Sequence, residues 1–190
     1  MVPKSNITGL ILAGGAGRRV DGRDKGLIPW RGKPLIAHVC DRLNPQIGEL
    51  LVSCNRNHLS YKAYSDVVIT DSRQDFQGPL AGMEAASTYV QTDFLVVVSC
   101  DMPVLPDDLV ERLVIPLEGT EDYRPDISYA HDGLRAQYLC AAIRRECLHC
   151  LSRYLDEGNR AVRDWFESQH TTCVDFSDKA SSFTNYNRLP

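Results

Sequence analysis

A glycine-rich segment near the start of the chain carries residue types that bind phosphate. It reads Leu12-Ala13-Gly14-Gly15-Ala16-Gly17-Arg18-Arg19 and leads on to Arg23 and Lys25. Glycines let a backbone approach a ligand closely with its N–H groups exposed, and such groups bind anions. Cations on Arg18, Arg19, Arg23 and Lys25 lie in the same short stretch. This concentration of positive charge predicts a site for a polyphosphate.

Two better-known glycine motifs do not fit this segment. A P-loop has Lys and then Ser or Thr after its last glycine, whereas Gly22 is followed by Arg23 and Asp24. In the dinucleotide-binding motif the third glycine would fall on Val20, so close helix packing beneath a pyrophosphate is not encoded. A plain turn between a strand and a helix needs no cluster of guanidinium groups. A phosphate-binding loop of another kind is therefore the favoured interpretation.

Three further polar residues follow apolar runs that are typical of strands. Asp101 comes just after residues 94–99, and a lone carboxylate there can hold Mg²⁺ when phosphates and water supply the other oxygens. Asn55 and Asp71 follow residues 49–53 and 67–70. They could contact a nucleobase or ribose, and a carboxylate suits the N–H donors of guanine. The alternative for each of the three is to cap a turn.

A second glycine segment, Gly78-Pro79-Leu80-Ala81-Gly82, stands where a helix is expected to begin. Glycine at such a position would bring the backbone close to a ligand. The alternative is a tight helix N-terminus without a ligand. We therefore regard Gly78 as a candidate ligand contact.

Strands and helices alternate along the first half of the chain. Strands are expected at residues 7–12, 49–53, 67–70 and 94–99. Helices are expected with Pro34 at a first position, after Gly78-Pro79, and after Pro106 with Asp107 and Asp108 in the first turn. Continuous apolar runs predict a parallel sheet buried on both faces. The residues that follow the strands would then meet in one crevice at the carboxyl edge.

The pattern changes after about residue 125. Strands are expected at 126–130 and 136–143 around the turn Asp132-Gly133, then a helix from Glu146 to near Gly158, an amphipathic stretch with Trp165 and Phe166, and a strand at 172–176. We predict an α/β fold, a three-layer sandwich whose mostly parallel, Rossmann-like sheet is covered by helices on both faces. A small antiparallel element belongs to its C-terminal part.

Composition limits the class of protein. A chain of 190 residues with 43% hydrophobic content suits a single domain, 1–190. The net charge of −4 argues against a nucleic-acid partner, and no apolar stretch has the length of a membrane span or signal peptide. Seven scattered cysteines suit a reducing compartment, and ordinary helix cysteines are favoured over a metal or redox site for Cys147-Leu148-His149-Cys150. We expect a cytoplasmic protein without a membrane partner.

The order and spacing of several segments resemble the molybdenum cofactor guanylyltransferases. Three of these segments are shared by many nucleoside triphosphate transferases: Leu12-Ala13-Gly14-Gly15-x-x-x-Arg19, Asp24-Lys25-Gly26 and Gly32-Lys33-Pro34-Leu35. The segment Cys100-Asp101-Met102-Pro103 also matches. Four others narrow the match: Gly78-Pro79-Leu80-Ala81-Gly82, His131-Asp132-Gly133, Asp175-Phe176-Ser177-Asp178 and Phe183-x-Asn185-x-Asn187. The resemblance covers nearly the whole chain.

The resemblance implies transfer of GMP from GTP to the phosphate of molybdopterin, with release of pyrophosphate and with Mg²⁺ as cofactor. It implies GTP contacts by Leu12, Ala13, Gly14, Gly15, Lys25, Ser53 or Asn55, Asp71, Gly78 and Asp101. Arg19, Lys25 and Asp101 would be catalytic, with Asp101 also on the metal. Gly82, Arg160, Asn185 and Asn187 would bind the acceptor. The nucleotide-binding half of the domain would span about residues 1–110, and the acceptor-binding half about residues 111–190.

The resemblance also implies transient contact with cofactor-insertion enzymes, chaperones and molybdoenzymes. Two departures stand out: Gln137-Tyr138 replaces a common His-Pro pair, and Ser53 replaces an asparagine. The alternatives are a nucleotidyltransferase with another base or acceptor, such as a molybdopterin cytidylyltransferase or a sugar-phosphate guanylyltransferase, and a non-catalytic nucleotide- or cofactor-binding module.

Overall fold

The apolar runs of the sequence form one central sheet of seven strands. The computed structural model describes residues 2–15, 22–73, 77–119 and 124–186. The strands, in the spatial order β5-β4-β1-β6-β8-β7-β9, are β1 (Ile7–Leu12), β4 (Glu49–Ser53), β5 (Val67–Ile69), β6 (Phe94–Ser99), β7 (Ile127–His131), β8 (Ala136–Arg144) and β9 (Thr171–Asp175). Neighbours pair in parallel except that β8 runs against β6 and β7. The predicted mostly parallel sheet with a small antiparallel element is confirmed.

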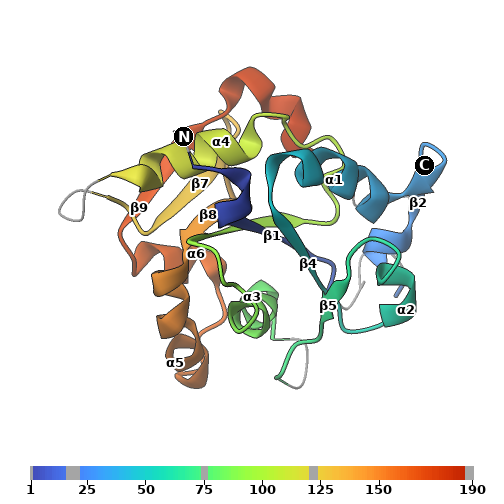
Figure 1. Ribbon diagram of the computed structural model, residues 1–190, viewed down its shortest axis with the longest axis horizontal. Coiled ribbons are helices and arrows are strands. Elements are labelled where there is room, and N and C mark those ends of the chain that lie inside the picture. Colours follow the sequence, from blue (N-terminus) through green and yellow to red (C-terminus); the bar gives the residue numbers. More distant parts are fainter. Residues whose placement is uncertain (1, 16–21, 74–76, 120–123, 187–190) are drawn as a thin grey trace.

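Helices cover both faces of this sheet (Figure 1). On one face lie α1 (Leu35–Leu43) and α4 (Leu109–Val114), and on the other lie α3 (Pro79–Ser87), α5 (Leu151–Asp156) and α6 (Val162–Glu167). The short helix α2 (His58–Tyr61) follows β4. Short 3₁₀ turns complete the described elements: η1 (Lys4–Asn6), η3 (Lys25–Leu27), η4 (Asn44–Gln46), η5 (Ile115–Glu118), η6 (Arg145–Cys150) and η7 (Ser177–Phe183).

Side chains of each central strand alternate between two hydrophobic cores. In β1, Ile7 and Ile11 pack with residues of α1 and α4, whereas Leu10 and Leu12 pack with residues of α3. All four side chains are buried, because a strand in the middle layer has no face toward water. The predicted three-layer sandwich is confirmed.

Three predicted helix boundaries were wrong. Pro34 has an extended ψ of 150° and precedes α1, which begins at Leu35. The helix after Pro106 begins only at Leu109, so Asp107 and Asp108 precede its first turn. The segment from Glu146 onward starts as η6 and becomes α-helical at Leu151. Residues near a helix end satisfy both interpretations locally, and tertiary contacts decide between them.

A small second sheet was not predicted. It pairs β2 (Pro29–Trp30) with β3 (Lys33–Pro34) in antiparallel fashion. Arg31 and Gly32 both have positive φ angles, 46° and 86°, which is the conformation of a tight two-residue hairpin turn. Gly32 adopts it without steric cost, and this glycine was the signal for the turn.

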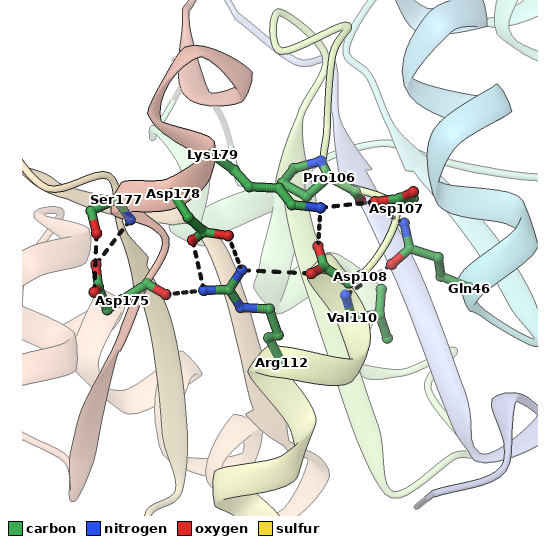
Figure 2. Close-up of polar contacts among 10 residues, drawn as sticks. All are labelled: Gln46, Pro106, Asp107, Asp108, Val110, Arg112, Asp175, Ser177, Asp178 and Lys179. Carbon is green, nitrogen blue, oxygen red and sulfur yellow. Dashed lines mark hydrogen bonds and ion pairs between the residues drawn. The ribbon is translucent and has the colours of Figure 1, made fainter.

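A network of ion pairs ties the C-terminal part of the chain to α4 (Figure 2). Arg112 of α4 contacts the Asp178 carboxylate at 3.0 and 3.1 Å and donates to the Asp175 carbonyl. Lys179 contacts Asp107 at 3.1 Å and Asp108 at 3.2 Å. The two aspartates expected inside the first turn of the helix instead hold η7 against it.

None of the helices in the described part of the chain is long and apolar enough to cross a bilayer. All seven cysteines are described, and each is a free thiol.

Candidate active site

Parallel pairing brings the ends of four strands into one row. Across the sheet this row reads Ile69, Ser53, Leu12 and Ser99. Two positions further along each strand come, in the same order, Asp71, Asn55, Gly14 and Asp101. The predicted gathering of these residues at the carboxyl edge is therefore what the strand register produces.

Asn55 and Ser53 orient the carboxylate of Asp71. The Asn55 side-chain amide donates to one oxygen of Asp71 at 2.7 Å, and its carbonyl oxygen accepts the backbone N–H of Asp71 at 3.1 Å. The Ser53 hydroxyl donates to the other Asp71 oxygen at 3.4 Å. Gly14 lies beside this pair, because a Cβ atom there would be 3.2 Å from the Asn55 amide nitrogen. Each Asp71 oxygen keeps lone pairs for N–H donors of a ligand.

Lys25 and Asp101 form an ion pair at the end of β6. The second Asp101 oxygen accepts a hydrogen bond of 2.5 Å from the Ser99 hydroxyl, and Asp101 is only 5% exposed. A nearly buried carboxylate requires such partners, because burial penalises an unpaired charge. The sequence placed Lys25 and Asp101 at one crevice, and Ser99 is an addition that only the structure reveals.

Buried contacts fix the turn that carries Lys25. The Tyr61 hydroxyl donates to Asp24, and the Asn57 amide donates to the other Asp24 oxygen at 3.0 Å. Burial, and then this bond to Asp24, raise the pKa of Tyr61 well above its ordinary value. A Cβ atom on Gly26 would lie 2.5 Å from the Tyr61 hydroxyl. Tyr61 thus contacts the chain on either side of Lys25, at Asp24 and at Gly26.

The start of α3 lies against the same strand ends. Gly78 has a φ of 84°, a conformation that favours glycine. A Cβ atom on Gly82 would lie 2.7 Å from the Ser53 hydroxyl and 2.8 Å from a Leu12 methyl carbon. Close helix packing is a sufficient reason for glycine at position 82, and its acceptor contact stays a prediction.

Two of the predicted acceptor residues come from distant parts of the chain. Arg160 donates to the Gln77 side chain and, at 2.7 Å, to the Leu155 carbonyl, so it lies beside the segment that leads into Gly78. The side-chain oxygen of Asn185 is buried and has no hydrogen-bond partner among the described residues. Arg19 and Asn187 lie outside the described residues.

The C-terminal segment reaches the Asp101 turn. The backbone N–H of Tyr186 donates to the Asp101 carbonyl at 3.0 Å, and the Tyr186 ring packs on Trp30 of β2 with centroids 4.8 Å apart. The second sheet therefore has a place in the site, since it supports the segment that carries Asn185.

Gln137, which replaces a histidine in the resemblance, turns toward the hairpin. Its amide donates to Asp132 at 2.6 Å, while the other Asp132 oxygen accepts the backbone N–H groups of Leu134 and Arg135, both at 2.8 Å. Tyr138 packs on Tyr129 and Phe166. Gln137 thus stabilises the β7–β8 hairpin, and Tyr138 belongs to the core beneath α6.

Comparison with known proteins places the chain in a family. The model of the MobA-like NTP transferase domain matches residues 9–173. A molybdenum cofactor guanylyltransferase from Shewanella sediminis is 39% identical over 181 residues, which cover 95% of this chain and 91% of that relative. Another from Cupriavidus pinatubonensis is 43% identical over 192 residues, covering 100% of this chain and 96% of the relative.

A solved structure supports the same fold. Molybdopterin-guanine dinucleotide biosynthesis protein A from Archaeoglobus fulgidus superposes with a TM-score of 0.74 at 24% identity. The match covers 95% of this chain and 92% of that one. By its sequence relatives and its domain match, the chain belongs to the MobA-like NTP transferases and, among them, to the molybdenum cofactor guanylyltransferases.

Proposed function

We propose that the protein transfers GMP from GTP to the phosphate of molybdopterin, forming molybdopterin guanine dinucleotide and pyrophosphate. The names of its relatives support this reaction. One observation in the structure carries it furthest: an oriented carboxylate, Asp71, and an ion pair, Lys25 with Asp101, flank the end of β1 at one sheet edge. Such an edge can hold a base on one side of the glycine segment and phosphates on the other.

On the base side, Asp71 would accept the N1–H and exocyclic amine donors of guanine. Ser53 and Asn55 both hydrogen-bond to Asp71, so both would act on the base through it. Cytosine and adenine present an acceptor nitrogen beside their amino group, and that nitrogen would face the carboxylate unpaired. A buried polar mismatch of this kind discriminates strongly between ligands.

On the phosphate side, the backbone of Leu12, Ala13, Gly14 and Gly15 would approach the triphosphate, with Gly78 at the start of α3. The acceptor phosphate is already an anionic nucleophile, so the protein has to align it with the α-phosphorus and neutralise charge. Lys25 and Arg19 would supply that positive charge. Lys25 would exchange its contact with Asp101 for one with phosphate oxygens.

Asp101 fits as one ligand of Mg²⁺. The ion prefers oxygen ligands and shares itself between one or two carboxylates, substrate phosphates and water. In the described part of the chain no group of three or more His, Cys, Asp or Glu side chains gathers, and Asp101 would hold the metal together with GTP. When bound, Mg²⁺ stabilises charge on the departing pyrophosphate. Ser99 keeps the Asp101 carboxylate in one orientation for this role.

The acceptor would bind between α3 and the C-terminal segment, with contacts from Gly82, Arg160, Asn185 and Asn187. The buried oxygen of Asn185, which has no hydrogen-bond partner among the described residues, would accept an N–H donor of the pterin. Cofactor-insertion enzymes, chaperones and recipient molybdoenzymes would meet the protein transiently. We place the reaction in the cytoplasm, whose reducing conditions suit seven free thiols.

The direct test is incubation with GTP, Mg²⁺ and molybdopterin, followed by mass analysis of the product. We expect molybdopterin guanine dinucleotide and an equal amount of pyrophosphate. The same incubation with CTP is the control. In a separate thermal-shift measurement, GTP should raise the melting temperature of the protein more than CTP or ATP does. A dinucleotide formed with CTP but not with GTP would show that the protein is a cytidylyltransferase. Nucleotide binding without release of pyrophosphate would indicate a non-catalytic module.

A further inference from the structure

We infer that Arg56 positions the backbone at Gly15 and at Gly22–Arg23 for the triphosphate of GTP. This residue follows β4 and is separate from the contacts proposed above. One Arg56 nitrogen donates to the Gly22 carbonyl at 2.6 Å, and the other donates to the carbonyls of Arg23 at 2.6 Å and Gly15 at 3.3 Å. Gly15 precedes residues 16–21, and Gly22 and Arg23 follow them. A single guanidinium therefore joins Gly15 to Gly22 and Arg23.

The chemistry of arginine suits this task. Its planar guanidinium has five N–H donors in a rigid fork, whereas a lysine ammonium is a point charge that cannot span the same set of acceptors. Asp24, which is itself 9% exposed, lies 3.8 Å from the Arg56 side chain and helps to hold it. A cation that binds the carbonyl oxygens of Gly15, Gly22 and Arg23 offsets their partial negative charge beside the segments that would approach the phosphates.

The neighbours of Arg56 extend its effect to the rest of the site. Asn55 contacts Asp71 on the base side, and Asn57 contacts Asp24 beside the catalytic Lys25. Three consecutive residues thus contact Asp71 on the nucleobase side, the backbone before and after residues 16–21, and the turn that carries Lys25. Arg56 acts through the backbone of Gly15, Gly22 and Arg23, and its loss should weaken binding of the triphosphate more than binding of the base.

The test rests on the proposed function for its choice of ligands, and it compares Arg56→Gln and Arg56→Lys with the unchanged protein. Binding of GTP and GMP is measured by calorimetry. We expect Arg56→Gln to weaken GTP binding by about tenfold or more, because it removes several bonds from a charged donor. GMP binding should change by less than about threefold, since GMP lacks the β- and γ-phosphates. Arg56→Lys should fall between.

Arg153→Gln is the matched control, because the Arg153 side chain is 86% exposed and, among the residues that the structure describes, pairs with Glu157 four positions along the chain. It should leave both affinities unchanged. In turnover, Arg56→Gln should raise KM for GTP and leave KM for molybdopterin unchanged. Equal losses of GTP and GMP binding, or wild-type GTP binding by Arg56→Gln, would overturn the inference.

The two proposals fail separately. If no dinucleotide forms but Arg56→Gln still weakens GTP binding more than GMP binding, the proposed transfer reaction is wrong and the positioning role of Arg56 stands. If the dinucleotide forms and Arg56→Gln has the KM of the unchanged protein for GTP, only the role of Arg56 is wrong.

Discussion

The residue on which the proposed chemistry most depends is Asp101, and its carboxylate already has two partners, Lys25 and the Ser99 hydroxyl. Asp101→Asn keeps the shape of the side chain and removes its charge. We expect kcat to fall by about a hundredfold or more, because the amide neither pairs with Lys25 nor binds Mg²⁺ as a carboxylate does. Release of pyrophosphate measures turnover, and the melting temperature shows that the fold is kept.

Asp41→Asn is the control for Asp101→Asn. Asp41 forms an ion pair with Lys33 at the surface, where its side chain is 61% exposed. Such pairs contribute little, so turnover should stay at the level of the unchanged protein. Unchanged turnover in Asp101→Asn itself would remove Asp101 from the proposed mechanism.

Close packing around Gly82 predicts that a larger residue there destabilises the fold. In Gly82→Ala the new methyl group would lie 2.7 Å from the Ser53 hydroxyl and 2.8 Å from a Leu12 methyl carbon. Overpacking of this kind typically costs about 1–3 kcal/mol, and urea unfolding measures it. Gly15→Ala is matched, since nothing lies within 4 Å of its Cβ position, and its free energy of unfolding should hardly change. Equal stability of the two variants would contradict the packing of α3.

The residues at the strand ends were predictable from the sequence, because apolar runs mark where strands end. Asp71 and Asp101 were predictable on that ground alone. The contact of Tyr61 with Asp24 was not, because it joins residues 37 positions apart and a buried tyrosine has no distinctive pattern in the sequence. Arg56 shows the same limit, since its type and place were visible but its three carbonyl acceptors lie 33 to 41 positions away along the chain.

At the scale of elements, the turn Asp132-Gly133 predicted the β7–β8 hairpin, but it did not predict where the hairpin joins the sheet. β8 inserts between β6 and β7, pairing antiparallel with both. The parallel pairing of β9 with β7 was equally hidden. Pairing partners are chosen by packing over the whole sheet, whereas a turn is chosen by a few local residues.

The contacts between α4 and the C-terminal segment should affect both the stability of the fold and binding of the acceptor. Arg112 holds Asp178 and the Asp175 carbonyl, and its guanidinium stacks on the Phe176 ring with 4.0 Å to the centroid. We expect Arg112→Met to lower the melting temperature by about 3 °C, a modest loss for a chain of this size. It should also raise KM for molybdopterin, because η7 leads to the segment that carries Asn185.

Arg163→Met serves as the control for Arg112→Met. Arg163 pairs with Glu167 four residues away on the surface of α6, and both side chains are more than half exposed. Neither the melting temperature nor KM for molybdopterin should change. If Arg112→Met also left both unchanged, the network would be a surface feature without influence on the acceptor.

At the scale of the whole molecule, ion pairs make stability depend on acid pH. A hydrogen bond from Arg73 holds the pKa of Glu84 below its ordinary value of 4.5, and one from Arg112 holds the pKa of Asp178 below 3.8. A folded pKa below the unfolded value means that the contribution is present above the unfolded value and is lost as pH falls through the folded one. The free energy of unfolding should therefore be flat near neutrality and fall below about pH 4.5, less steeply in Asp178→Asn.

Buried thiols give the same molecule an alkaline limit of opposite sign. Burial raises the pKa of Cys40 from 9.0 to about 12 and that of Cys54 from 9.0 to about 11. A raised folded pKa means that this contribution is complete below the unfolded value and is lost as pH rises through the folded one.

Urea unfolding between pH 3 and 11 should thus give a plateau that declines above about pH 9, where unfolded thiols ionise. In Cys40→Ala the alkaline decline should be shallower while the acid limb keeps its shape. An alkaline limb identical to that of the unchanged protein would mean that the Cys40 thiol ionises as readily in the folded core as in the unfolded chain.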